Sequence, residues 1–144
     1  MSGFKDLKIV FVGEMVPGMR SFQRFEILNS IIPSVVKIST RNNSHLTLLH
    51  RLKNKAFRAF NLVYDEFRAD EQLYEIILKE PKVDIIWLEK AAQIRRETLL
   101  AFKKKFKNGK IVFLSEDEMF LSHNQNPNFL NTIDLYDLFV TTKK

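Results

Sequence analysis

Three short runs of apolar residues constrain the fold of this chain more than any other feature. Leu7 to Val12 reads LKIVFV, Val83 to Leu88 reads VDIIWL, and Ile111 to Leu114 reads IVFL. All three are rich in β-branched and aromatic residues, and none shows a regular alternation of polar and apolar side chains. Strands of this kind are buried on both faces, which is typical of a parallel sheet between two layers of helices.

Segments with helical periodicity separate these runs, so strands and helices alternate along the chain. We predict helices over about 22–31, 45–63, 71–79 and 95–106, and further strands over 35–39 and 138–141. Ser21 is the expected N-cap of the first helix, and Asn42 to Ser44 form the turn before the second. Gly109 is expected to end the fourth helix in a left-handed conformation. The prediction is one domain over 1–144, a Rossmann-type three-layer α/β/α sandwich with a mostly parallel five-stranded sheet.

The composition describes a globular domain with a basic surface. The chain has 144 residues and no cysteine, which excludes disulfides and thiolate chemistry and fits a reducing cytoplasm. Lys and Arg number 23 against 17 Asp and Glu, and the net charge of +6 attracts phosphates, nucleic acid or anionic lipid. No apolar run reaches the roughly 20 residues of a membrane span. We therefore expect a cytoplasmic protein, with a peripheral place at the inner membrane face as one option.

Polar residues follow three predicted strands at their carboxyl ends, where open α/β sheets bind ligands. After the first strand, Gly13 and Gly18 have the glycine spacing of a P-loop, but Met19-Arg20 replaces its Lys-Ser/Thr pair. This loop is either an ordinary turn or a backbone cradle for a sugar or phosphate. In the second case Arg20 and Arg24, one helical turn apart, are the candidate clamps.

The other two loops carry acids. Glu89-Lys90 directly follows VDIIWL and can bond ligand hydroxyls or pair with neighbouring charges. The acidic run from Ser115 to Glu118 offers no clean set of converging metal ligands, so neither a metal site nor another cofactor is expected. Asp117 is the candidate to bind or deprotonate a hydroxyl, with His123 and Asn124 within reach of the same loop.

A basic segment lies in the predicted second helix. Four of its side chains are basic and no acid interrupts them: Arg51, Lys53, Lys55 and Arg58. The simplest interpretation is a solvated face, with the leucines and phenylalanines of this helix packed into the core. The functional alternative is contact with an anionic membrane surface, because the chain lacks the aromatic and basic pattern of an RNA-binding sheet.

Three segments together resemble the N-terminal domain of bacterial glycosyltransferases of the two-domain GT-B fold, in particular the family-4-like and spore-maturation-protein-B-like groups. They are KIVFVGEMVPGMRSFQR, VDIIWLEKAAQIRRETLLAFK and KIVFLSEDEMFLSHNQNPNFLNTIDLYDLFVTTK. The matching motifs are Arg20-Ser21, Glu89-Lys90, Arg96 to Leu99, Asp117-Glu118, His123-Asn124 and Tyr136 to Lys143. Glu118 departs from the second Asp that is frequent in the group, and residues 45–80 match nothing in it.

The resemblance implies the acceptor-binding half of an enzyme that transfers a sugar from a nucleotide sugar to a glycan or lipid-linked hydroxyl. It implies that Asp117 orients or deprotonates the acceptor, and that the substrate contacts are Gly13, Arg20, Ser21, Arg24, Glu89, Lys90 and Asn124. The donor-binding C-terminal domain is missing from this sequence, which stops after the fifth strand. We expect either a truncated chain or a stand-alone half, without transferase activity alone, in polysaccharide or glycoconjugate synthesis.

Two other functions fit the pattern less well. A receiver-like regulatory module would share an acidic cluster after a strand and a lysine near a later strand end, here Lys143. Receivers need an acid pair after the first strand, however, and Gly13-Glu14 does not supply one. A nucleic-acid-binding domain is supported by charge alone, and nucleic acid is not an expected partner.

Overall fold

A computed structural model describes residues 3–41, 47–117 and 121–142 of the chain. Its centre is a five-stranded sheet in the order β2-β1-β3-β4-β5, and every neighbouring pair of strands is parallel. The strands are β1 (Lys8–Gly13), β2 (Ser34–Ser39), β3 (Ile85–Glu89), β4 (Lys110–Ser115) and β5 (Leu138–Thr141). The predicted fold class, a Rossmann-type sandwich around a parallel sheet, is confirmed.

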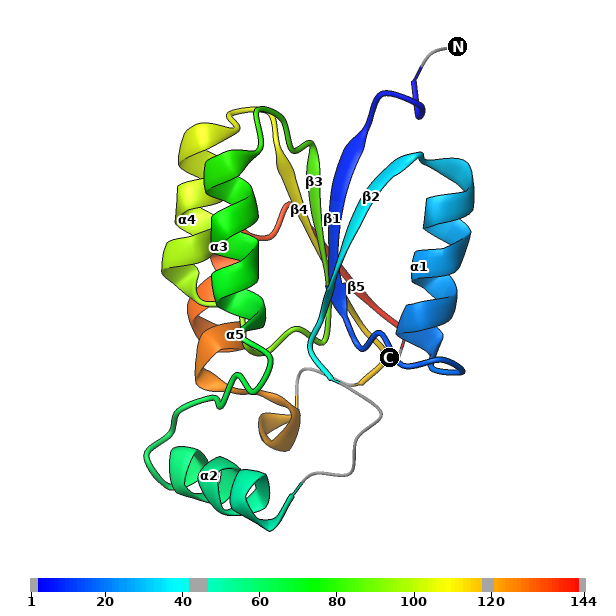
Figure 1. The fold of residues 1–144 in the computed structure, drawn as a ribbon. Helices are drawn as coiled ribbons and strands as arrows, with labels where there is room; N and C mark the ends of the chain where they lie inside the picture. The colour runs from blue at the N-terminus through cyan, green and yellow to red at the C-terminus, as the bar shows by residue number, and fades with distance from the viewer. Residues whose placement is uncertain (1–2, 42–46, 118–120, 143–144) are drawn as a thin grey trace.

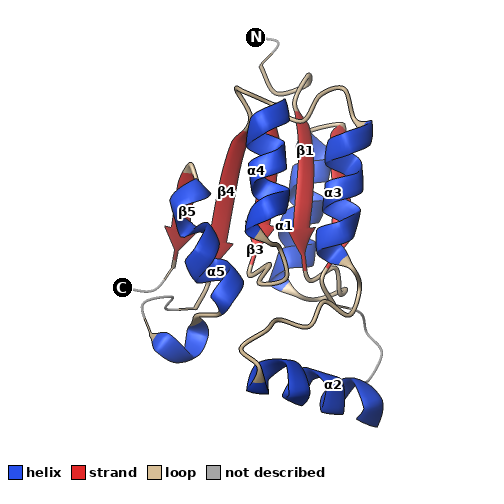
Figure 2. Ribbon diagram, turned by 90° about the vertical axis from the view of Figure 1, so that its left-hand side faces the viewer, coloured by secondary structure: helices blue, strands red, loops and turns tan. Residues whose placement is uncertain are grey.

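Helices lie on both faces of this sheet (Figures 1 and 2). One face carries α1 (Arg20–Ile31), and the other carries α3 (Ala69–Lys79), α4 (Arg96–Lys105) and α5 (Pro127–Thr132). Short 3-10 turns at Ser122–Asn124 and Ile133–Leu135 flank α5. The main core lies between the sheet and the three-helix layer, where Val10, Leu73 and Leu99 are fully buried.

The two faces of the sheet are covered unequally. Of the described helices, α1 alone lies on its face, and it contacts β1 and β2. Strand register places Trp87 and Leu138 on the same face as Phe11, which packs against Phe25 of α1. Trp87 is only partly buried and Leu138 is 54% exposed. The sheet therefore presents a half-covered apolar surface beyond α1.

Helix α2 (Leu48–Ala59) stands apart from the sandwich, beyond the carboxyl edge of the sheet (Figures 1 and 2). Thr47 caps it by accepting a hydrogen bond from the backbone N–H of His50. None of its residues is buried, and Leu48, Leu49 and Leu52 are more than half exposed. The interpretation that its leucines form a core face is therefore wrong. Helical periodicity identifies an apolar face, but it does not tell what covers that face.

Two predictions about helix ends are also wrong. Ser21 lies inside α1, whose N-cap is Met19, and its hydroxyl donates to Glu89 instead of capping the helix. Gly109 does not adopt a positive φ, which among the described glycines occurs at Gly18. Position 109 needs a glycine for lack of space, because a Cβ there would lie 2.4 Å from Cζ of the buried Phe102. The predicted cap at 42–44 lies outside the described residues, as do Glu118 and Lys143.

Gly109→Ala is expected to destabilise the domain by about 1–3 kcal/mol, since Phe102 is enclosed and cannot move away from an added methyl group. Urea denaturation followed by circular dichroism measures the loss. Gly3→Ala is the matched control, because a Cβ there meets nothing within 4 Å. Equal stability of the two variants would contradict this account of Gly109.

Within the described part of the chain, no helix is long and apolar enough to cross a membrane.

Candidate functional site

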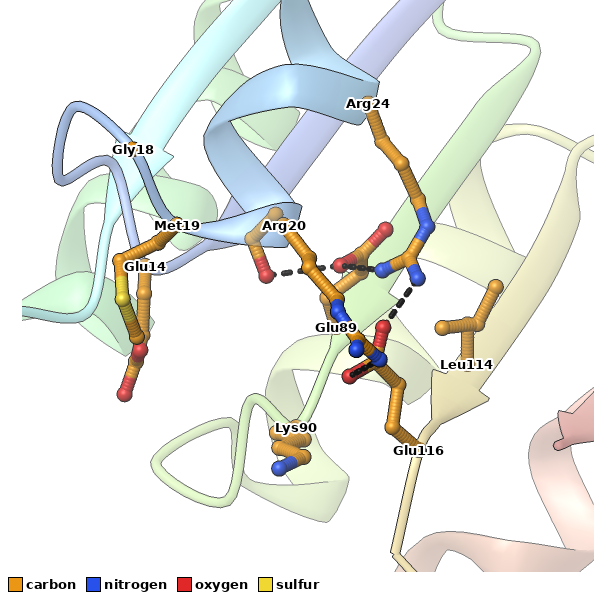
Figure 3. A pocket seen from close by; sticks show the side chains of 10 residues that line it. Glu14, Gly18, Met19, Arg20, Arg24, Glu89, Lys90, Leu114 and Glu116 are labelled. Carbon is orange, nitrogen blue, oxygen red and sulfur yellow. Dashed lines mark hydrogen bonds and ion pairs between the residues drawn. The ribbon is translucent and has the colours of Figure 1, made fainter. Parts of the chain in front are cut away.

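A cleft of about 320 Å³ opens at the carboxyl ends of β1, β3 and β4 (Figure 3). We call it the carboxyl-edge cleft. Its polar lining comes from Glu14, Arg20, Ser21, Arg24, Glu89, Lys90 and Glu116, and the rest from Gly18, Met19 and Leu114. In the strand order seen here the connections leave β1 and β3 in opposite directions, and such a switch point is where doubly wound sheets bind ligands.

Glu89 forms the floor of this cleft. It is the last residue of β3 and is 2% exposed, so its carboxylate needs partners. Its Oε2 accepts hydrogen bonds from the Ser21 hydroxyl at 2.7 Å and from Arg24 Nη1 at 2.8 Å. Its Oε1 accepts one from the Trp87 indole N–H at 3.2 Å. Three donors thus hold one buried carboxylate in a fixed orientation.

Arg24 joins Glu89 to a second acid, Glu116, which follows β4 (Figure 3). Burial lowers the pKa of Arg24, but its hydrogen bonds and charge contacts with Glu116 and Glu89 outweigh that effect and the net shift is upward. The hydrogen bond from Arg24 holds the pKa of the Glu116 carboxyl below its ordinary value. Arg20 contacts the other oxygen of Glu116 at 3.0 Å. The two arginines and the two glutamates therefore form one connected network across the cleft.

Lys90 has a backbone conformation that lysine rarely adopts, with φ at 48°. Its backbone N–H donates to the carbonyl of Leu114 at 3.2 Å, which ties the end of β3 to β4. Its side chain reaches Asp117, with 2.9 Å between Lys90 Nζ and Asp117 Oδ2. Left-handed non-glycine residues concentrate at functional sites, where the surrounding structure holds them.

The cleft is suited to hydroxyl groups because it keeps both acceptors and donors available. A carboxylate offers about four lone-pair positions. The contacts described above use three of them on Glu89 and two on Glu116. With respect to the residues that the structure describes, each oxygen of Glu116 and Oε1 of Glu89 can therefore accept a further hydrogen bond. An alcohol is both donor and acceptor, so it can bind a carboxylate and a guanidinium of this network at once.

The described residues contain no group of three or more His, Cys, Asp or Glu side chains placed to share a metal ion. Glu89 and Glu116 already have arginine between them.

The structure brings most of the predicted site residues together. Arg20, Ser21, Arg24, Glu89 and Lys90 all line the carboxyl-edge cleft. Gly13 does not line it, but a Cβ there would lie 3.3 Å from the Glu89 Cβ, so the glycine leaves room for that side chain. Asp117 lies at the rim through its contact with Lys90, and its side chain is 44% exposed.

Asn124 belongs to a different hollow. With His123 it lines a second cleft of about 530 Å³ between the segment before α5 and the end of α2, which contributes Asn54 and Arg58. Six of its thirteen lining residues carry side-chain amides, and Gln93 contributes a buried side-chain oxygen that has no hydrogen-bond partner among the described residues. The single site predicted for all these residues is thus divided into two hollows.

Sequence reasoning missed three contributors: Glu14, Trp87 and Glu116. Trp87 precedes Glu89 by two positions, and strand alternation alone could have placed it beside the carboxylate. Glu116 sits in an acidic run whose members cannot be ranked until the loop is placed. The available signal in the sequence was the pair of arginines one helical turn apart, Arg20 and Arg24, which indicates that acidic side chains face them.

The acid stability of the domain should report on Glu116, because its folded pKa is lowered. Its contribution is complete above its unfolded pKa of about 4.3 and is lost as the pH falls through the lower folded value. We expect Glu116→Gln to cost about 1 kcal/mol at pH 7, and the difference from wild type to shrink as the pH falls below the unfolded pKa. Urea denaturation at several pH values measures it. A difference that stays constant down to pH 3 would contradict the ion-pair assignment.

No protein-family model matches the chain, and no curated protein sequence matches it significantly.

Proposed function

We propose that this domain binds the acceptor substrate of a glycosyltransferase, a sugar or lipid-linked hydroxyl compound, in its carboxyl-edge cleft. In this proposal a second domain binds the donor nucleotide sugar, and the protein acts in polysaccharide or glycoconjugate synthesis. The resemblance of three segments to GT-B glycosyltransferases suggests the family. The chemistry of the cleft is the independent support.

The observation that carries the proposal is the Glu89–Arg24–Glu116 network. Its carboxylates and guanidiniums alternate across the cleft, so neighbouring hydroxyls of a sugar can each find an acceptor and a donor. The arginines and Lys90 are already paired with acids, which makes a neutral polyol a better ligand than a free phosphate. Asp117, half exposed at the rim, is the proposed group that orients or deprotonates the accepting hydroxyl.

The receiver-like alternative has less support. A phosphate acceptor after β3 would have to be Glu89, which is 2% exposed and holds three hydrogen-bond donors. An incoming phosphoryl group would have to displace Arg24 and Ser21. Labelling with a small-molecule phosphoryl donor such as acetyl phosphate tests this, and covalent phosphate on the chain would favour the receiver.

Saturation-transfer-difference NMR on this 144-residue chain tests the proposal, with a panel of neutral oligosaccharides and nucleotide sugars as ligands. We expect saturation of at least one oligosaccharide, a strong reduction in Arg24→Gln, and no release of nucleotide. Lys79→Gln is the matched control, since it removes one exposed paired cation of α3. Absence of any oligosaccharide signal from the folded chain, or turnover of a nucleotide sugar by it, would contradict the proposal.

A further inference from the structure

Helix α2 carries an apolar surface that nothing in the described structure covers. We call it the α2 stripe: Leu48, Leu49, Leu52 and Phe60, which are 73%, 59%, 57% and 79% exposed. The first three lie in α2, and Phe60 is its C-cap residue. Contiguous exposed apolar side chains of this size mark interaction surfaces, whereas single exposed leucines do not.

The opposite side of α2 faces the domain. His50 approaches Glu66, with 3.1 Å between His50 Nδ1 and Glu66 Oε1. The ring centroids of Phe57 and Tyr64 lie 5.2 Å apart. Residues advance by about 100° per position around a helix, so His50, Asn54 and Phe57 share one side and the α2 stripe occupies the other. The helix is therefore held against the domain in an orientation that points its apolar side outward.

Basic side chains border the α2 stripe on both sides. Lys53 follows Leu49 by four positions, while Arg51 and Lys55 follow Leu48 and Leu52 by three. Within the described residues none of these cations forms an ion pair, nor does the exposed Arg58, and the sequence from 47 to 62 contains no acid. An apolar stripe between basic borders is the pattern of a helix that lies in the interface of a bilayer.

The position of α2 connects it to the carboxyl-edge cleft. The strands point toward α2, which lies beyond the same edge of the sheet as the cleft (Figures 1 and 2). Glu14 and Lys90 line both this cleft and an adjoining hollow that is also lined by His50 and Asn54 of α2. A surface that binds the α2 stripe would therefore lie on the side of the molecule to which the cleft opens.

We propose that α2 docks the domain on an anionic lipid bilayer, with the α2 stripe in the headgroup region and the basic side chains on lipid phosphates. Charge complementarity favours an anionic bilayer over a second copy of the chain as the partner of the α2 stripe. In a symmetric contact between two copies of α2 the basic borders would face each other, whereas anionic headgroups neutralise them. The lipid contact does not depend on sugar transfer. Its consequence for the cleft, access to an acceptor carried by a lipid, rests on the proposed function.

Co-sedimentation with vesicles tests the proposal, using phosphatidylcholine alone and phosphatidylcholine with phosphatidylglycerol. We expect binding to the anionic vesicles, at least tenfold weaker binding to the neutral ones, and a decrease as salt is raised. Leu49→Gln/Leu52→Gln should lose tenfold or more in affinity, and Lys53→Gln/Lys55→Gln a similar amount. Because all four positions are exposed, these variants should fold as wild type does.

Matched controls separate the α2 stripe from general surface effects. Ile27→Gln/Ile31→Gln removes two side chains of α1 that are 60% and 58% exposed, and Lys104→Gln/Lys107→Gln removes two exposed cations. Both controls should bind anionic vesicles within about twofold of wild type, since they lie outside α2. Equal binding of wild type to neutral and anionic vesicles, or controls as damaging as the α2 variants, would overturn the proposal. So would self-association in the absence of vesicles that the Leu49/Leu52 variant abolishes, which would assign the α2 stripe to a second copy.

Discussion

Replacing Glu89 with alanine should abolish oligosaccharide binding and lower the free energy of unfolding by about 2–3 kcal/mol. The substitution leaves the Ser21 hydroxyl, the Trp87 indole and one side of Arg24 without the carboxylate that accepts from them. Loss of one partner from a buried ion pair costs up to about 5 kcal/mol. The expected value is smaller because Arg24 keeps Glu116 and is 30% exposed.

Urea denaturation and saturation-transfer NMR on the same preparations measure the two effects. Glu75→Ala is the control, since it removes an acid that is 57% exposed and paired with Lys79 on α3. That change should cost less than about 0.5 kcal/mol and leave binding intact. If Glu89→Ala bound oligosaccharide as wild type does, the cleft floor would not be the binding site.

Replacing Phe113 with alanine should cost about 3–5 kcal/mol, a large part of the stability of a domain of this size. Phe113 of β4 is 1% exposed and lies at the centre of an aromatic cluster. Its ring stacks on the rings of Tyr136 and Phe139, with 4.9 Å and 5.7 Å between ring centroids. The centroid of the Phe129 ring lies 5.3 Å away. The cluster attaches α5 and β5 to the sheet, so its loss should loosen the whole segment after β4.

Chemical denaturation again measures the loss, and proteolysis can locate it after β4. Phe4→Ala is the matched control, because Phe4 is 69% exposed and its removal should change stability by less than about 0.5 kcal/mol. Phe113→Leu keeps most of the volume and should cost less than the alanine variant. A loss below about 1 kcal/mol in Phe113→Ala would show that this aromatic cluster does not hold the segment.

The sheet could be predicted from the sequence because its strands are short, apolar and rich in β-branched residues. Leu138–Thr141 agrees at both ends with β5, and the other strands agree to within two residues. Some conspicuous polar residues of these segments serve the fold itself. Asp137, for example, accepts hydrogen bonds from the Ile111 backbone and from Lys103, which fixes the start of β4.

What could not be predicted depends on tertiary contacts. The pattern of α2 is that of any amphipathic helix, and only the structure tells that its apolar side faces outward. Ser21 has the residue type of an N-cap, but the buried acid at Glu89 competes for its hydroxyl. Gly109 looks like a left-handed C-cap, whereas the need for space beside Phe102 explains it. In each case a non-local neighbour decided the role of the residue.

The candidate site, too, could be predicted only in part from the sequence. That polar residues at the ends of parallel strands converge follows from topology, and Arg20, Arg24, Glu89 and Lys90 were predicted on that basis. Glu116 lines the cleft, whereas Asp117 lies at its rim beside Lys90. The sequence could not distinguish these two positions, because adjacent loop residues point in different directions. Asn124 was assigned to the same site, but it is the last residue of the 3-10 turn Ser122–Asn124 and lines the second hollow.

The most direct test of the carboxyl-edge cleft uses Trp87, the one tryptophan of the chain, whose indole N–H donates to Glu89 at 3.2 Å. In a ¹H–¹⁵N correlation spectrum it gives a single indole resonance, which can be followed while the oligosaccharide panel is added. We predict that a binding oligosaccharide shifts this resonance in wild type and not in Arg24→Gln. An indole resonance that stays fixed while the same oligosaccharide binds the folded chain would place the sugar elsewhere and contradict the account.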